Sequence, residues 1–290
     1  MEKWTAADMP DQTGRTVVVT GANRGLGLEM VRVLAERGAH VVMTARDLEK
    51  GRAAAARVSG SVEARVLDLA DLDSIARFAA GIERADVLIN NAAAIMTPRD
   101  TTEQGFELQL GTNHLGPFAL TAQLYPVLRE GKSPRIVTAS SAIYKQGKID
   151  FDDLGSTRSY SPSSAYARSK LASTLFALEL DRRLQVSGSP VLSVLSHPGY
   201  TASNPGQAKS LLLRLGDRLM AQNVTMGALG ALYAATNPGV QGGEFYGPVG
   251  MGGTRGFPMP VKVNGAATDP ALARRMWEVS EKLTAVPFPV

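Results

Sequence analysis

The chain has 290 residues, of which 44% are hydrophobic, and its formal net charge is +4 at pH 7. This length suffices for one large hydrophobic core, and no linker-like stretch interrupts the chain, so we expect a single domain over residues 1–290. The absence of cysteine from the sequence excludes disulfides, zinc–thiolate sites, iron–sulfur ligation and cysteine nucleophiles within this chain.

The basic residues are distributed among acidic ones, as where Arg182 and Arg183 follow Glu179 and Asp181. This pattern favours a solvated basic surface over a nucleic-acid site. Residues 1–14 lack the apolar core of a signal peptide, and no run of eighteen apolar residues occurs. We therefore expect a cytoplasmic protein without a membrane span.

Short runs rich in Val, Ile and Leu alternate with segments whose apolar residues lie three and four apart, such as 115–125 and 171–178. The runs indicate strands buried on both faces, and the segments indicate helices. Their order predicts an α/β fold, a single-domain Rossmann-type doubly wound parallel sheet with helices on both faces and ligands at the carboxyl ends of the strands. The predicted strands are 16–20, 40–45, 62–67, 87–90, 135–139 and 191–195.

A glycine-rich turn follows the first predicted strand. It reads Thr20-Gly21-Ala22-Asn23-Arg24-Gly25-Leu26-Gly27 and leads directly into the predicted helix 28–37. Glycines at these positions allow backbone amides and the positive end of the helix to approach a pyrophosphate. Packing alone also produces such turns, so the turn is a weak signal until its context is added.

The end of the second predicted strand distinguishes the two nicotinamide cofactors. A carboxylate there would bind the ribose hydroxyls and repel a 2′-phosphate, but the sequence has Ala45 followed by Arg46. Arg46 and Arg24 can converge on a phosphate, which predicts NADPH or NADP+ rather than NADH. The alternative is that both are surface arginines and that Asp47 caps a helix beginning at Leu48.

Tyr166 and Lys170 lie four residues apart at the start of an apolar-periodic helix, so they share one face. A nearby ammonium lowers the pKa of a phenol, which makes Tyr166 a candidate acid in reduction and base in oxidation. Ser141, just past the fifth strand, can hydrogen-bond a substrate oxygen, with Ser140 as the competing assignment.

Taken together, these motifs resemble the short-chain dehydrogenase/reductase family, in its retinol-dehydrogenase-like branch. The resemblance covers residues 14–200, and Ala93 departs from it because the family more often has glycine there. It implies an NAD(P)-dependent oxidoreductase acting on CH–OH or C=O, with a catalytically idle NADP(H)-binding regulator or scaffold as the alternative. The matching residues are Thr20 to Gly27, Asp68, Asn90-Asn91-Ala92-Ala93, Tyr166-Ala167-Arg168-Ser169-Lys170 and Pro198-Gly199.

The resemblance also assigns roles. It implies that Asn113 holds a water for proton relay to Lys170, which itself binds the nicotinamide ribose. Asn113 bonding backbone within a helix, and Asp68 or Asp71 capping the next helix, are the alternatives. Whether Thr201 or Ser203 contacts the nicotinamide stays open. The implied cofactor-binding residues are Gly21, Asn23, Arg24, Gly25, Leu26, Gly27, Arg46, Asp68, Leu69, Asn90, Ala92, Tyr166, Lys170, Pro198, Gly199 and Ser203, and no metal site is expected because the three histidines lack ligand spacing.

Three apolar segments are candidate walls of a substrate site, which indicates a lipophilic carbonyl or alcohol unless they only pack onto the body. They are a lid at 200–223, Ile95 with Met96, and the insert between Ser141 and Tyr166 with Ile143, Tyr144, Ile149, Phe151, Leu154 and Tyr160. Beyond the lid we expect a helix at 226–235, a strand at 243–246, and a C-terminal tail and helix over 247–290, in which a Gly- and Pro-rich stretch at 247–260 leads to a final helix at 270–284. The resemblance also implies a homo-oligomer, paired through the helices that hold Asn113 and Tyr166.

Overall fold

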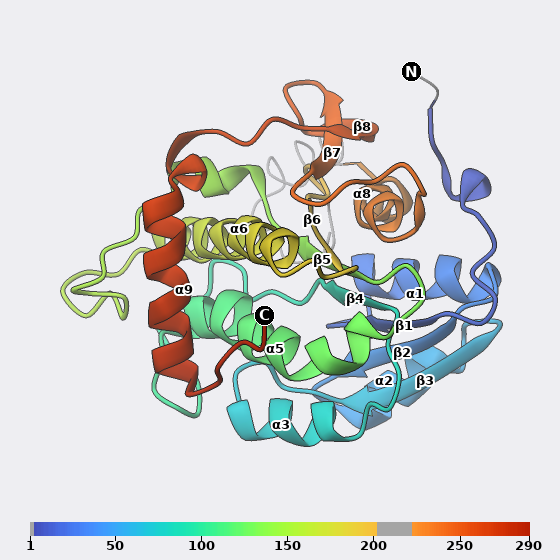
Figure 1. Ribbon diagram of the computed structural model, residues 1–290, viewed down its shortest axis with the longest axis horizontal. Coiled ribbons are helices and arrows are strands. Elements are labelled where there is room, and N and C mark those ends of the chain that lie inside the picture. The colour runs from blue at the N-terminus through green and yellow to red at the C-terminus, as the bar shows by residue number, and fades with distance from the viewer. Residues whose placement is uncertain (1–2, 202–221) are drawn as a thin grey trace, which may run out of the picture.

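The computed structural model describes residues 3–201 and 222–290. Within them the chain forms an eight-stranded sheet in the order β3-β2-β1-β4-β5-β6-β7-β8, in which β8 runs antiparallel to β7 (Figure 1). The predicted doubly wound sheet is therefore confirmed. The strands are β1 Thr16–Val19, β2 His40–Ala45, β3 Ser61–Val66, β4 Val87–Asn90, β5 Arg135–Ala139, β6 Leu192–Ser196, β7 Phe245–Gly250 and β8 Arg255–Pro260.

Helices cover both faces of this sheet. Side chains of α1, α2 and α8 form one core with β1 and β2, while α3, α5, α6 and α9 form a second core on the opposite face. The helices are α1 Gly25–Glu36, α2 Leu48–Ala55, α3 Leu72–Ala80, α4 Leu108–Leu110, α5 Gly116–Arg129, α6 Pro162–Val186, α8 Val224–Thr236 and α9 Pro270–Thr284, with short turns η1 Ala6–Asp8, η2 Gly111–Leu115, η3 Ala142–Gln146 and η4 Gly265–Thr268.

The central strands are apolar throughout because successive side chains enter opposite cores. Val17 and Val19 pack in the core with α1, and Val18 packs in the core with α5. β3 departs from the prediction of a strand buried on both faces. It forms the sheet edge and is only partly buried, so charged residues such as Glu63 and Arg65 are tolerated there.

Side-chain caps set where several helices begin. Asp47 accepts a hydrogen bond from the Lys50 amide at 3.1 Å and caps α2, as the alternative for this residue predicted. Asp71, and not Asp68, caps α3 by accepting from the Asp73 amide at 2.9 Å. Asn223 caps α8 in the same way.

The C-terminal part is more ordered than its composition suggests. The expected strand at 243–246 is β7 at 245–250, and the Gly- and Pro-rich stretch after it turns back as β8, so this stretch extends the sheet. The helix predicted at 270–284 is α9, which lies across α6 and α5 (Figure 1). Phe288 then packs against Phe118, with ring centroids 5.7 Å apart, and closes that core.

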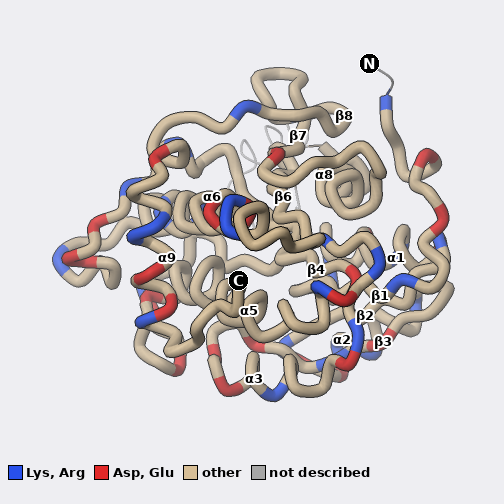
Figure 2. The backbone as a smooth tube through the Cα atoms, viewed as in Figure 1, with Lys and Arg blue, Asp and Glu red and all other residues tan. Residues whose placement is uncertain are grey.

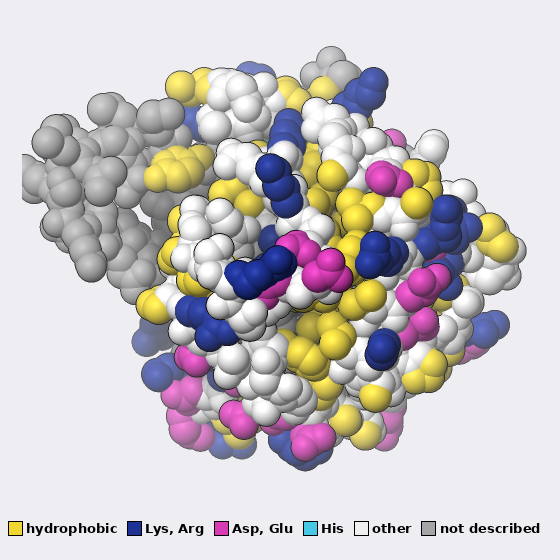
Figure 3. Space-filling view, turned by 90° about the vertical axis from the view of Figure 1, so that its left-hand side faces the viewer, with side chains coloured by type: hydrophobic (Ala, Val, Ile, Leu, Met, Phe, Trp, Pro, Cys, Tyr) yellow, Lys and Arg dark blue, Asp and Glu magenta, His cyan; other side chains and the backbone are white. Residues whose placement is uncertain are grey.

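Basic and acidic residues are scattered along the backbone between uncharged stretches (Figure 2). On the face that carries α9, basic and acidic side chains are interspersed with small apolar areas (Figure 3). Among the residues that the structure describes, no helix is long and apolar enough to cross a membrane.

Candidate active site

The sheet order reverses between β1 and β4, and in doubly wound sheets a ligand site lies at the carboxyl ends of the strands beside this point. The glycine turn follows β1, Asn90 ends β4, Ser141 follows β5 and the Pro198-Gly199 turn follows β6. The fold therefore brings the segments predicted from the sequence to one edge of the sheet.

The glycine turn requires glycine for two separate reasons. Gly21 and Gly25 adopt φ values of +61° and +57°, in the left-handed region that glycine occupies without strain. A Cβ on Gly27 would lie 2.6 Å from the Gly21 carbonyl oxygen, so the backbones approach too closely for a side chain. Thr20 fixes the turn to the strand end beside it, because its Oγ1 accepts hydrogen bonds from the amides of Asn91 at 2.9 Å and Ala92 at 3.0 Å.

The glycine turn is also joined to the end of β2. The Ala22 amide donates to the Thr44 carbonyl at 2.9 Å, and the Gly21 amide donates to the Thr44 hydroxyl at 3.3 Å. Ala45 is buried beside this junction, while Arg46 is exposed. Thr44, which the sequence analysis did not single out, thus places the turn that carries Arg24 next to the strand end that carries Arg46.

The strand ends beyond the turn supply polar groups. Asn90 is buried, its Nδ2 donates to Thr121 at 3.1 Å, and its Oδ1 has no hydrogen-bond partner within residues 3–201 and 222–290. The Asp68 carboxylate accepts from the Ala70 amide at 2.9 Å and so shapes the turn before α3, with Leu69 buried beside it. A glycine cradle together with a buried, unsatisfied acceptor fits a nicotinamide dinucleotide, with the residues named here as those that would hold it.

Tyr166 and Lys170 share one face of α6, as predicted. The Lys170 ammonium donates to the Ala139 carbonyl at 2.8 Å and lies 5.8 Å from the centroid of the Tyr166 ring. Burial raises the pKa of Tyr166 to about 12 and lowers that of Lys170 to about 8, because it disfavours the charged form of each.

The expected lowering of the Tyr166 pKa by Lys170 is therefore wrong for this structure. Burial has the larger effect on the phenol, and the interaction that opposes it comes from the Ser141 side chain. Tyr166 is consequently neutral at pH 7. The two serines are distinguished as well, since the Ser140 hydroxyl is buried against that of Thr174 at 2.8 Å, whereas Ser141 is only partly buried and faces Tyr166.

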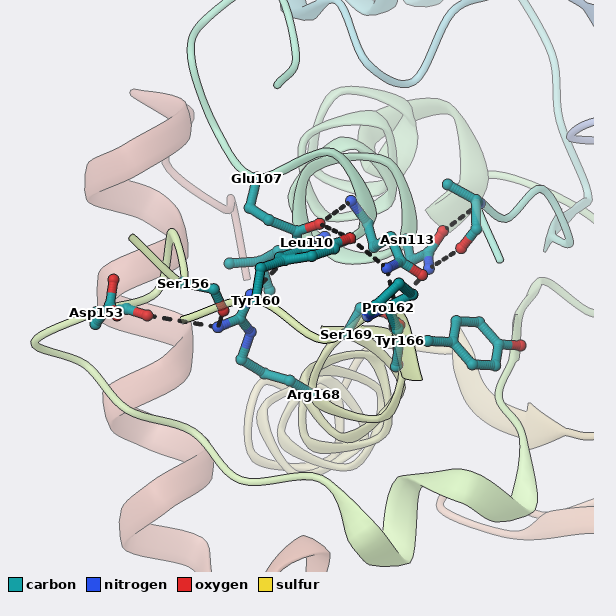
Figure 4. Close-up of polar contacts among 12 residues, drawn as sticks. Glu107, Leu110, Asn113, Asp153, Ser156, Tyr160, Pro162, Tyr166, Arg168 and Ser169 are labelled. Atoms are coloured by element: carbon teal, nitrogen blue, oxygen red, sulfur yellow. Dashed lines mark hydrogen bonds and ion pairs between the residues drawn. The ribbon is translucent and has the colours of Figure 1, made fainter. Parts of the chain in front are cut away.

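Asn113 lies in η2, a single turn of π-helix of the kind that often marks functional sites. Its Oδ1 accepts from the Ala94 amide at 2.7 Å, and its Nδ2 donates to the Ala94 carbonyl at 2.8 Å and to Ser169 at 2.9 Å (Figure 4). The Asn113 side chain bonds backbone groups, as the alternative predicted. These groups belong to the segment after β4 and not to the helix of Asn113 itself. The backbone carbonyl of Asn113 accepts a hydrogen bond from the Ser173 hydroxyl at 2.8 Å. A role of Asn113 in proton relay stays a prediction.

The turn after β6 is equally constrained. Gly199 has φ +65°, and a Cβ there would lie 2.4 Å from the Thr254 carbonyl oxygen. His197 accepts from the Gly199 amide at 3.2 Å and orients the turn. The Thr201 hydroxyl donates to the Pro198 carbonyl at 2.8 Å, while Ser203 and most of the predicted 200–223 lid lie outside the described residues.

The insert between Ser141 and Tyr166 was predicted to form a wall of the substrate site, but most of its apolar residues pack in or against the core. Tyr144 is buried with its ring 6.0 Å from that of Phe245, and Phe151 lies under the Arg275 guanidinium of α9 at 4.0 Å. Ile149 and Leu154 pack against the same cluster, because α9 covers this part of the insert. Ile95 and Met96, by contrast, are exposed, and they follow Ala94, whose backbone is bound by Asn113.

Comparison with known proteins agrees with this geometry. The family model described as short chain dehydrogenase matches residues 15–210. Human retinol dehydrogenase 13 is 48% identical over 204 residues, which cover 67% of this chain and 61% of that protein. The chain thus spans less than two thirds of this relative.

Longer matches extend the likeness to nearly the whole chain. Human retinol dehydrogenase 14 is 36% identical over 303 residues, covering 94% of this chain and 87% of the relative. A crystal structure of an uncharacterized protein from Mycobacterium paratuberculosis superimposes with a TM-score of 0.87 at 45% identity, and the match covers 100% of both chains. From these matches and the site at the strand ends we conclude that the chain belongs to the short-chain dehydrogenase family and is an oxidoreductase acting on CH–OH or C=O groups.

Proposed function

We propose that the protein is an NADPH-dependent oxidoreductase that transfers a hydride between the nicotinamide and a lipophilic carbonyl or alcohol. The observation that carries this proposal is that Lys170 bonds the last residue of β5 and Tyr166 faces Ser141 just beyond it, at the same edge of the sheet as the glycine turn. A catalytically idle cofactor-binding protein would have no need of this arrangement.

A nicotinamide cofactor would be held by the glycine turn and Lys170, and when bound it would supply or accept the hydride at the substrate carbon. Ser141 hydrogen-bonds the substrate oxygen and stabilises negative charge on it. Tyr166 gives its proton to that oxygen in reduction and removes it in oxidation. Lys170 is largely protonated at neutral pH, and its ammonium favours the phenolate that Tyr166 becomes in this step. The same side chains serve both directions.

The preference for NADPH rests on charge at the end of β2. Ala45 removes the carboxylate that would repel a 2′-phosphate, and Arg46 and Arg24 supply cations at the same corner. A preference for NADPH favours reduction as the physiological direction.

The lipophilic substrate is supported by the exposed apolar pair Ile95 and Met96 and by the names of the retinol dehydrogenase relatives. A cytoplasmic location and a homo-oligomeric state remain predictions. Pairing through α5 and α6 would have to accommodate α9, which lies across both.

The test begins with fluorescence titrations of NADPH and NADH, followed by absorbance decay at 340 nm with a panel of lipophilic ketones and aldehydes. Tyr166→Phe should keep its NADPH affinity and lose about 10²- to 10⁴-fold in kcat, because the proton donor is gone. Tyr125→Phe is the matched control, since Tyr125 bonds Ser189 away from the site.

Near-normal turnover by Tyr166→Phe would contradict the mechanism. NADPH binding by the wild type without turnover of any carbonyl would favour the idle regulator or scaffold. Failure to bind either cofactor would contradict the assignment of the glycine turn.

A further inference from the structure

The segment 94–97 follows β4 at the carboxyl edge of the sheet, where the candidate active site lies. Its first residue, Ala94, is bound through both its amide and its carbonyl by Asn113. The side chains that follow, Ile95 and Met96, are 54% and 49% exposed. Met96 has φ +48°, a left-handed conformation that costs free energy in a residue other than glycine and persists only where its surroundings impose it.

Two side chains impose this conformation. Gln109 Oε1 accepts from the Met96 amide at 2.8 Å, and the Tyr160 hydroxyl donates to the Thr97 carbonyl at 3.0 Å. Gln109 Nε2 donates to that hydroxyl at 2.8 Å, so Gln109 and Tyr160 form one clamp on the segment. Because Gln109 precedes Asn113 by four residues, one helical turn, both amides face the same segment.

The clamp is anchored in a buried polar network. Gln109 Nε2 also donates to the carbonyl of Pro162, the first residue of α6. The backbone amide of Gln109 donates to Glu107 Oε1 at 2.8 Å. Glu107 in turn pairs with Arg168 at 3.2 Å, with side chains 0% and 7% exposed. Figure 4 shows Arg168 and Tyr166 pointing away from one another across α6. The network therefore ties the start of the catalytic helix to segment 94–97.

Such a buried network is costly unless its polar groups are satisfied. The side-chain amide of Gln109 uses its oxygen and both of its N–H groups in hydrogen bonds, and this side chain is fully buried. The network binds the backbone of Met96 and Thr97, while the apolar side chains of Ile95 and Met96 are exposed. A rigid polar support beneath an exposed apolar pair is the arrangement of a binding wall.

We propose that Gln109 and Tyr160 are positioning residues that fix Ile95 and Met96 as a wall of the substrate site and thereby set the affinity for long lipophilic substrates. The proposal rests on the proposed function, because it assumes that the site takes a carbonyl substrate. Loss of the clamp removes binding free energy that stabilises the bound substrate and the transition state equally. KM therefore rises while kcat is retained.

The experiment compares Tyr160→Phe and Gln109→Met with the control Tyr125→Phe, which removes a tyrosine hydroxyl bonded to Ser189. Decanal and propanal are assayed with NADPH, and hydrogen exchange of the Met96 amide is followed by NMR after labelling with 15N-methionine. For both clamp variants we expect KM for decanal to rise about fivefold to tenfold, with kcat and the NADPH Kd within about twofold of the wild type. KM for propanal should not change, and Met96 exchange should accelerate about tenfold in Gln109→Met.

A fall in kcat at constant KM, an equal rise in KM for both aldehydes, or unchanged Met96 exchange would overturn the proposal. The same changes in Tyr125→Phe would also overturn it, because they would reflect general loosening. A wild type that binds NADPH but reduces neither aldehyde contradicts the proposed substrate class instead. In that case the clamp is judged by Met96 exchange, with unchanged exchange in Gln109→Met counting against it.

Discussion

The proposed preference for NADPH depends on one side chain, Arg46. It is exposed at the carboxyl end of β2, where Ala45 takes the place of an acid, and the Thr44 contacts bring the glycine turn alongside. A charge-assisted hydrogen bond to a phosphate contributes about 1.5–3 kcal/mol, which corresponds to roughly tenfold to a hundredfold in affinity. The 2′-phosphate that NADH lacks is the only group on which this contribution depends.

Arg46→Ala should therefore weaken NADPH binding by about tenfold or more and change NADH binding by less than about twofold. The two dissociation constants are measured by fluorescence titration. Arg52→Ala is the control, because Arg52 lies further along α2 in an exposed ion pair with Glu49. Equal weakening of both cofactors would show that Arg46 does not reach the 2′-phosphate.

At the scale of elements, the close approach of the β1–α1 turn to the end of β4 shapes the cofactor cradle. A Cβ on Gly27 would meet the Gly21 carbonyl oxygen at 2.6 Å and Asn91 Nδ2 at 2.8 Å, and the first of these is backbone that cannot rotate away. Substitution there must push α1 away from the strand ends, at the cost of about 1–3 kcal/mol that overpacking carries.

We expect Gly27→Ala to fold with a lower midpoint in urea and to bind NADPH at least about tenfold more weakly, because the amides of the turn move off the phosphates. Urea unfolding and cofactor titration measure the two effects separately. Gly239→Ala is the control, since a Cβ there meets the end of the Asn237 side chain at 3.3 Å. Unaltered NADPH affinity in Gly27→Ala would show that the turn does not carry the phosphates.

At the scale of the whole molecule, buried histidines couple stability to pH. Burial lowers the pKa of His114 to about 3 and that of His197 to about 4, so the folded chain does not protonate them where the unfolded chain, with a pKa near 6.5, does. Stability contributed by the neutral forms is complete above pH 6.5 and falls as the pH decreases toward 4. Asp181 acts in the opposite sense between about pH 6 and 4, because burial raises its pKa to about 6.

Replacing one histidine isolates its share. His114 lies among Phe118 and Phe176, with its Nε2 2.7 Å from Ser280, so His114→Leu keeps an apolar environment and removes the titrating group. As the pH decreases from 6 to 4, the wild type should lose about 1.4 kcal/mol more unfolding free energy per pH unit than this variant loses. Urea unfolding at several pH values measures the slope, and His40→Gln is the control because His40 is partly exposed. Parallel slopes in His114→Leu and the wild type would contradict the assignment.

The sequence by itself determined the parts of this protein that depend on local pattern. The order of strands and helices, the place of the glycine turn, the pairing of Tyr166 with Lys170 and the extent of the final helix follow from periodicity and from motifs spaced along one stretch of chain. Family membership followed from the same motifs.

Only the tertiary structure decided what depends on contacts between distant segments. It showed that the Gly- and Pro-rich stretch pairs as β8, that the insert packs under α9, and that burial, opposed by Ser141, raises the Tyr166 pKa. It also revealed the clamp of Gln109 and Tyr160, residues 51 positions apart. Burial, strand pairing and such long-range hydrogen bonds are properties of the assembled core, and they have no signature in the neighbouring sequence.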